Sequence, residues 1–306
     1  MPYLTSASEM RAIVAEYTNA KTLWIDTEVA DYKSRNPRLS LIQVLDNPQD
    51  MSGDRVYLLD VLEQPNIIAE FIDKIMINSA IEKVFHNASY DIKLLGNKKA
   101  ENITCTLEMA KKIPYYLLPL PNYQLKTIAT ALCSFNNIDK QEQKSDWGKR
   151  PLTEEQIEYA YLDCIYLAQI HLNLLDLQAQ ASPEPATEDL RSLSTRYSQV
   201  EQQWKLLNSE FEHLQERIKK AMQAQDISET YDYKLTSYER TTIKAAFTEL
   251  AKLAQAQGIN LDFPITLTQK LQKDLGQNLE KLSVDVDKNT SWRLIPKTQE
   301  SEAEDE

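Results

Sequence analysis

The chain has 306 residues, 42% of them hydrophobic and 26% charged, a composition typical of a globular protein with room for two domains. Its formal net charge of −12 argues against binding duplex nucleic acid through a basic surface. No run of about 18 apolar residues occurs, and no basic stretch precedes an apolar core at the N-terminus, so we expect no membrane span, no signal peptide and a cytoplasmic location. Three widely spaced cysteines predict neither a disulfide framework nor a structural zinc site.

Apolar periodicity in the first 105 residues predicts an α/β fold. Helical spacing of apolar residues indicates helices over residues 6–19, 65–78 and 88–95. Short apolar runs between turn signals indicate strands over 22–28, 39–46, 55–61, 83–86 and 103–104. Strands that come first and then alternate with helices predict a mixed sheet flanked by helices.

Two acids lie at the end of the predicted strand over 22–28. In the run from Leu23 to Glu28, side chains alternate between faces, so Asp26 and Glu28 point the same way. Two carboxylates on one side of a buried strand are costly unless they are neutralised, and a divalent cation commonly does this. The alternative is a surface strand end with two solvated acids.

Two later segments supply further acids. Asp91 lies on the helix that follows the strand over 83–86. A capping signature at Thr153 begins a helix that runs to about residue 177 and carries Tyr159 and Asp163. These two residues are four apart, about one turn, so they share a face of the helix.

Asp26, Glu28, Asp91 and Asp163, together with Tyr159, resemble the DEDD family of 3′→5′ exonucleases, in the subgroup with a tyrosine in its third motif. The flanks over 39–44 and 145–153 look like ribonuclease D. The resemblance covers about residues 1–178 and implies a ribonuclease H-like fold. It also implies an exoribonuclease that releases nucleoside 5′-monophosphates from RNA 3′ ends, such as those of tRNA precursors. Cys105-Thr106 departs from the Asp-Thr that ribonuclease D often has, but no expected metal ligand lies there.

The resemblance implies two divalent cations held by Asp26, Glu28, Asp91 and Asp163. Ligands that are all oxygens favour Mg²⁺, with Mn²⁺ as a substitute. Two such ions about 4 Å apart can activate a water and neutralise charge at the phosphorus. A phenol of ordinary pKa, near ~10, is a poor base, so we expect Tyr159 to orient the attacking water.

Five further residues near the expected cation site are candidates for substrate binding: Thr27, Arg35, Gln43, His86 and Asn87. For Arg35, which shares its loop with Lys33 and Arg38, a solvated loop is the alternative. His86 has a packed, hydrogen-bonded histidine as its alternative. Trp147 is either a core residue or a platform on which a base stacks.

The sequence changes character after residue 178. Residues 179–187 predict a linker, and residues 188–225 a long helix whose apolar residues are spaced alternately three and four apart, as in a coiled coil. This seam either packs on its own chain or joins two chains in a homodimer. Residues 226–297 predict a small domain with helices over 237–257 and 266–282 and a terminal hairpin, compatible with a winged helix. Residues 298–306 predict an acidic disordered tail.

Two other functions remain open from the sequence. One is a DNA 3′→5′ exonuclease, because the same cation site serves either nucleic acid. The other is an inactive RNA-binding or scaffold protein built on the same fold. The four acids and the tyrosine are all present, and clustered carboxylates without a cation cost stability. This favours the active exoribonuclease.

Overall fold

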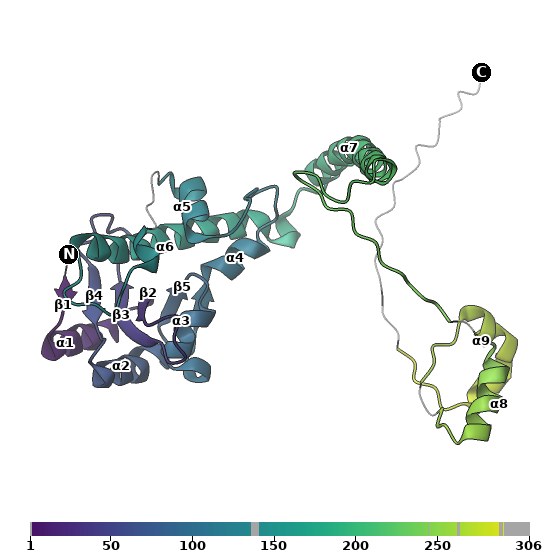
Figure 1. Ribbon diagram of the computed structural model, residues 1–306, viewed down its shortest axis with the longest axis horizontal. Helices are drawn as coiled ribbons and strands as arrows, with labels where there is room; N and C mark the ends of the chain where they lie inside the picture. The colour runs from purple at the N-terminus through teal and green to yellow at the C-terminus, as the bar shows by residue number, and fades with distance from the viewer. Residues whose placement is uncertain (1, 136–140, 244, 262–263, 288–289, 291–306) are drawn as a thin grey trace. The chain divides into compact units, whose positions relative to one another are not determined.

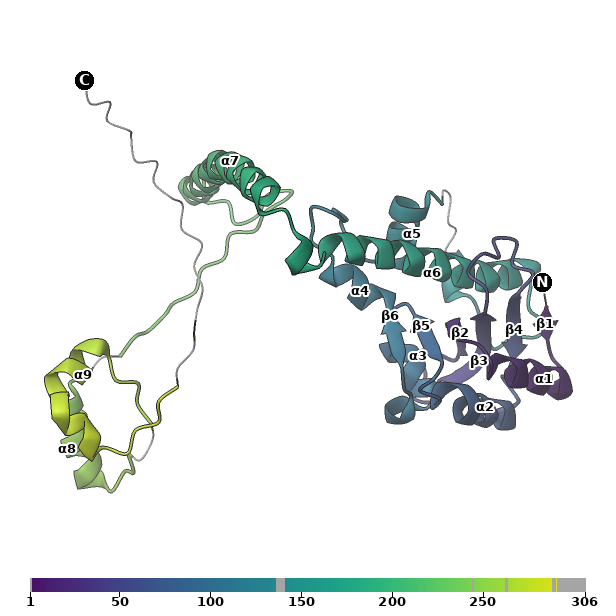
Figure 2. The same ribbon diagram turned by 180° about the vertical axis from the view of Figure 1, so that it is seen from behind.

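The computed structural model describes residues 2–135, 141–243, 245–261, 264–287 and 290. The chain divides into two compact units, Met1–Leu206 and Leu207–Glu306. Within the first unit, six strands form one sheet in the order β1-β4-β3-β2-β5-β6, which is followed from right to left in Figure 2. The strands are β1 (Tyr3–Leu4), β2 (Thr22–Ala30), β3 (Arg38–Leu45), β4 (Val56–Asp60), β5 (Glu82–Phe85) and β6 (Ile103–Cys105).

The sheet is mixed, as the sequence predicts. β2, β3 and β4 form antiparallel pairs, while β1 pairs with β4, β5 with β2, and β6 with β5 in parallel. The ladder between β2 and β5 ends at Trp24 and Val84. Because β2 continues to Ala30, its last residues extend past β5 and have a sheet partner only in β3. The end of β2 is therefore open on one side.

Helices cover one face of the sheet with α1 (Ala7–Tyr17), α2 (Pro65–Phe71) and α3 (Ser89–Leu94), which lie below the strands in Figure 1. A π-helical turn (Ile72–Met76) continues α2. A buried apolar cluster fills the space between these helices and the sheet, with Met10, Ile25, Ile42, Phe71 and Phe85 among its members.

The other face is covered by α6 (Glu154–Ala181), which crosses above the strands in Figure 1. It begins with the capping box that the sequence predicts: Gln156 N–H donates to Thr153 Oγ1 at 3.2 Å, and Thr153 N–H donates to Gln156 Oε1 at 3.0 Å. A second buried cluster, including Leu41, Leu58, Val84 and Cys164, joins α6 to the sheet. A third joins α6 to α4 (Thr106–Lys112) and α5 (Leu125–Cys133).

Most expected elements of this unit are confirmed, with two differences. The two-residue strand β1 was not predicted, because a strand this short has no readable period. α6 extends to Ala181, into the expected linker, since the alanines and glutamines there favour helix. A 3₁₀ turn (Pro185–Thr187) follows.

The 35-residue helix α7 (Leu190–Ala224) agrees with the heptad pattern and runs from the first unit into the second. The expected helix over 237–257 is shorter, α8 (Phe247–Gln257), and the one over 266–282 consists of α9 (Gln269–Leu275) and a 3₁₀ turn (Gly276–Lys281). Residues 283–287 and 290 are the described part of the expected hairpin, and no strand occurs in them. The rest of the hairpin and the expected tail at 298–306 lie outside the described residues. Of the helices in the described ranges, none combines the length and hydropathy that a bilayer crossing needs.

Candidate active site

Three of the expected acids meet between β2 and α6. Asp26 and Glu28 lie on the open end of β2, on one face, and Asp163 lies on α6. One carboxylate oxygen from each side chain lies within 4.8 Å of the other two. Residues 137 positions apart in the sequence are thus brought together because α6 crosses the sheet above this end of β2.

The electrostatics of this trio are unfavourable for three bare carboxylates. Burial raises the pKa of Asp26 well above its ordinary value, and the neighbouring Asp163 and Asp91 carboxylates raise it further. Burial likewise raises the pKa of Glu28, and the charges of Asp26, Asp163 and Asp91 add to the effect. Such groups are stabilised either by a bound proton or by a cation.

Asp91 lies beside the trio without joining it. Its side chain is 7% exposed, and Thr27 Oγ1 donates a hydrogen bond to Asp91 Oδ1 at 2.5 Å. Burial raises the pKa of Asp91 to about 6, while the bond from Thr27 opposes that rise. The fourth expected ligand is therefore electrostatically coupled to the other acids but does not belong to the group of oxygens within 4.8 Å.

Tyr159 lies one turn before Asp163 on α6, as expected. Burial raises its pKa, and the carboxylates of Asp163, Glu28 and Asp26 raise it further, so the phenol stays protonated. The Trp147 ring packs against the Tyr159 ring, with centroids 6.1 Å apart and planes at 45°. Trp147 is 2% exposed, which makes it a core residue rather than an exposed stacking platform.

A cavity of about 670 Å³ opens over the acids. Asp26, Glu28 and Asp163 line it together with Tyr159 and three of the expected substrate-binding residues, Thr27, His86 and Asn87. His86 Nδ1 also lies 2.9 Å from Thr106 Oγ1, so a hydrogen bond holds the ring at the cavity wall. Both readings of His86, a packed residue and a cavity residue, are compatible with this position.

Two expected substrate-binding residues do not line the cavity. Gln43 lies opposite Asp26 in the β2–β3 ladder, but it is fully buried beneath α6. Its amide atoms have no hydrogen-bond partner among the described residues. Arg35 lies in the exposed loop between β2 and β3. The neighbouring Arg38 is engaged with Asp31 and Glu63, at 3.0 and 3.1 Å.

The far wall of the cavity was not predicted from the sequence. It consists of side chains from α4, from the segment that leads into α5, and from the loop before α6: Leu107, Lys111, Asn122, Tyr123, Gln124, Leu125 and Gln143. Their spacing in the chain carries no motif, and only the packing of α4 and α5 against α6 places them here. Amides, a phenol and an ammonium give this wall hydrogen-bond donors opposite the acids.

The donor set fits divalent cations. Three carboxylates offer hard oxygen ligands in a confined, largely buried space, and the donors are those that Mg²⁺ and Mn²⁺ prefer. Neither a histidine nor a cysteine belongs to the group, so a zinc site of the usual nitrogen and sulfur ligands does not fit.

Comparison with known proteins identifies the family of the first 178 residues. A profile of the 3′-5′ exonuclease family matches residues 1–178. Ribonuclease D of Shewanella sp. is 29% identical over 179 residues, which cover 58% of this chain and 44% of that protein. DNA polymerase I of Aquifex aeolicus is 26% identical over 194 residues, covering 63% of this chain and 30% of that protein.

Among solved structures, Escherichia coli RNase D is similar with a TM-score of 0.48 and 22% identity, over 58% of this chain and 45% of that one. The chain spans less than half the length of the ribonucleases D of Shewanella sp. and Bartonella henselae that it matches. The family match covers more than half of this chain. The expected mixed sheet flanked by helices is confirmed, and the chain belongs to the 3′→5′ exonuclease family, as a ribonuclease D-like member of its DEDD group.

Proposed function

We propose that this protein is a 3′→5′ exoribonuclease that removes nucleoside 5′-monophosphates from single-stranded RNA tails, such as those of tRNA precursors. The observation that carries the proposal is the trio of Asp26, Glu28 and Asp163 at the floor of a cavity of about 670 Å³. The ribonuclease D relatives favour RNA as the substrate.

Each residue of the site has a role in this proposal. Asp26, Glu28, Asp91 and Asp163 would hold two divalent cations, Mg²⁺ or Mn²⁺. The cations supply activation of water and neutralisation of phosphoryl charge. Tyr159 keeps its proton and orients the attacking water through its hydroxyl. Thr27, His86 and Asn87 contact the 3′-terminal nucleotide from the cavity wall.

Cys105, Cys133 and Cys164 are free thiols, which fits a reducing compartment such as the cytoplasm.

DNA is the second candidate substrate. The match to DNA polymerase I favours it, because the same cation chemistry cleaves either backbone.

The test uses a 3′-tailed single-stranded RNA and its DNA equivalent, each labelled at the 5′ end. Digestion is followed with Mg²⁺, with Mn²⁺ and with EDTA, for the wild type and for Asp26→Asn. We expect a ladder that shortens from the 3′ end of RNA, depends on the cation and is absent for the variant. A ladder on DNA alone would establish the second candidate. Tight RNA binding without any ladder would identify an inactive binding protein.

We further propose that α7 joins two copies of the chain in a parallel coiled coil. Of its side chains, only Met222 is buried, and its apolar seam is exposed along its length: Leu190, Leu193, Tyr197, Val200, Trp204, Leu207, Phe211, Leu214 and Ile218. With these residues at the a and d positions, Arg196 of one helix faces Glu201 of a parallel copy. In the antiparallel alignment that overlaps the whole seam, Arg196 faces Arg217 instead, and these like charges repel.

Light scattering on the full chain tests the dimer. We expect twice the mass of one chain for the wild type, and the mass of one chain for Leu207→Lys at the centre of the seam. Gln202→Lys, at the outward f position, is the control and should leave the dimer intact. A wild type that is monomeric at micromolar concentration would favour packing of the seam on its own chain.

A further inference from the structure

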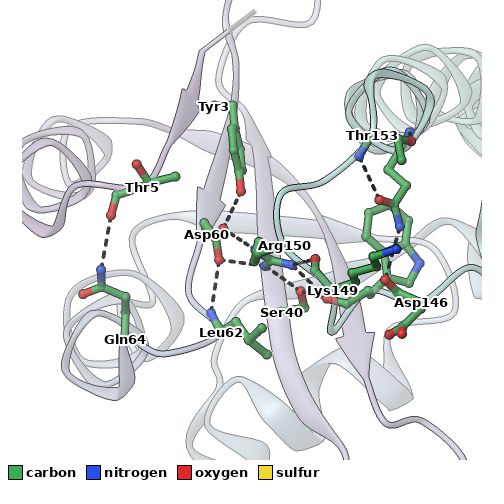
Figure 3. A network of polar contacts seen from close by, with 12 residues as sticks. Tyr3, Thr5, Ser40, Asp60, Leu62, Gln64, Asp146, Lys149, Arg150 and Thr153 are labelled. Carbon is green, nitrogen blue, oxygen red and sulfur yellow. Dashed lines mark hydrogen bonds and ion pairs between the residues drawn. The ribbon is translucent and has the colours of Figure 1, made fainter.

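An ionic cluster outside the cavity joins the loop before α6 to the edge of the sheet (Figure 3). Arg150 Nε and Nη2 donate to the two carboxylate oxygens of Asp60 at 2.5 and 2.7 Å. The Tyr3 hydroxyl donates to the same carboxylate from β1. Neither Arg150 nor Asp60 lines the cavity, so any effect of this cluster on the site has to pass through other residues.

The remaining donors of Arg150 hold the backbone of the loop. Nη1 donates to the carbonyl oxygens of Trp147 and Lys149 at 3.0 and 2.8 Å. Nη2 also donates to Ser40 Oγ at 2.9 Å, and the Ser40 hydroxyl donates in turn to the Trp147 carbonyl at 2.5 Å. The rigid fork of the guanidinium group thus holds the Trp147 carbonyl directly, through Nη1, and also through the Ser40 hydroxyl that Nη2 contacts.

The start of α6 holds the same loop from the opposite end. Gln156 Nε2 donates to Ser145 Oγ at 2.8 Å and to the Asp146 carbonyl at 3.4 Å. Between these two anchors, the buried Trp147 ring packs on Tyr159. A continuous series of contacts therefore leads from Asp60 through Arg150 and Trp147 to Tyr159.

We propose that Arg150, oriented by Asp60, is a positioning residue for Tyr159. A tyrosine ring that rotates or shifts moves its hydroxyl relative to the Asp163 carboxylate. The Trp147 ring prevents this shift as long as its backbone is held in place. The inference rests on the proposed role of Tyr159 as the group that orients the attacking water. A displacement of about 1 Å at such a group can cost up to ~100-fold in rate.

Arg150→Lys tests the proposal, because lysine keeps the positive charge and loses the fork. We expect kcat to fall about tenfold while KM changes by less than about twofold and the Mg²⁺ affinity, measured by calorimetry, is unchanged. In a Tyr159→Phe background, the same substitution should lower kcat by less than about twofold, because no hydroxyl remains to be positioned.

Arg55→Lys is the matched control. Arg55 makes a similar forked pair with Asp46 in the connection between β3 and β4, and Asp46 is 13% exposed where Asp60 is 12%. Neither Arg55 nor Asp46 lines the cavity. We expect Arg55→Lys to keep the wild-type kcat. If Arg150→Lys does not fold, Tyr3→Phe removes one hydrogen bond of the cluster and should lower kcat in the same direction.

Hydrogen exchange separates this inference from the proposed function. Exchange of the amides over residues 145–150 should accelerate in Arg150→Lys and stay at the wild-type rate in Arg55→Lys. A folded Arg150→Lys with the wild-type kcat would overturn the inference, as would an equal loss in both Tyr159 backgrounds or unchanged exchange. A wild type that cleaves neither RNA nor DNA would instead overturn the proposed function, and the exchange rates would still decide whether Arg150 holds the loop.

Discussion

Replacing Asp163 by asparagine should make the cation-free protein more stable while abolishing its activity. The substitution keeps the shape of the side chain and removes one of three carboxylates whose oxygens lie within 4.8 Å of one another. At an effective dielectric constant of about 20, two unit charges at that distance repel by about 3.5 kcal/mol. The acids relieve part of this repulsion by binding protons, as the raised pKa values of Asp26 and Glu28 indicate.

We therefore expect the free energy of unfolding in EDTA to increase by about 1–3 kcal/mol, less than the full pairwise repulsion. For a domain of this size each kcal/mol corresponds to about 2–4 °C in Tm. Thermal unfolding is measured for the wild type and Asp163→Asn, with EDTA and with Mg²⁺. Mg²⁺ should raise the Tm of the wild type more than that of the variant, because the variant has lost one ligand.

Asp176→Asn provides the control, because Asp176 lies on the same helix with an exposed side chain. Its stability should stay within about 0.5 kcal/mol of the wild type, and its activity should be unchanged. Two results would refute the reasoning. The first is an Asp163→Asn variant that is less stable than the wild type in EDTA and whose Tm rises with Mg²⁺ as much as that of the wild type. The second is a variant that retains turnover.

Three further predictions concern single groups. Tyr159→Phe should lower kcat without changing the Mg²⁺ affinity, and an unchanged rate in the digestion assay would remove the phenol from the mechanism. Burial raises the pKa of Asp91 to about 6, and a cation needs the ionised carboxylate. The Mg²⁺ affinity measured by calorimetry should therefore fall as the pH is lowered through about 6. Equal affinities at pH 5.5 and 7.5 would contradict the place of Asp91 in the ligand set. Burial lowers the pKa of Lys83 from 10.5 to about 8. Between these values the unfolded chain binds more protons than the folded one at Lys83, so this residue contributes stability that increases with pH. After allowance for solvent screening, denaturant titrations should find that the free energy of unfolding of the wild type, relative to that of Lys83→Met, rises by about 1–2 kcal/mol from pH 8 to 10.5.

Local periodicity alone determined much of the site. A period of two residues in a strand places Asp26 and Glu28 on one face, and a spacing of four in a helix aligns Tyr159 with Asp163. The start of that helix could also be predicted, because the capping box of Thr153 is a contact between residues three apart. Each of these features depends on backbone geometry within one element, which a sequence specifies directly.

Contacts between distant segments were decided only by the tertiary structure. The sequence could not tell that Asp91 lies just outside the acid trio or that Gln43 is buried opposite Asp26. Nor does any spacing predict the bond from Arg150 to Asp60, which joins residues 90 positions apart. The physical reason is that periodicity fixes the face on which a side chain lies. Whether two faces meet within hydrogen-bond distance depends on how the sheet and α6 pack, and therefore on all the buried side chains between them.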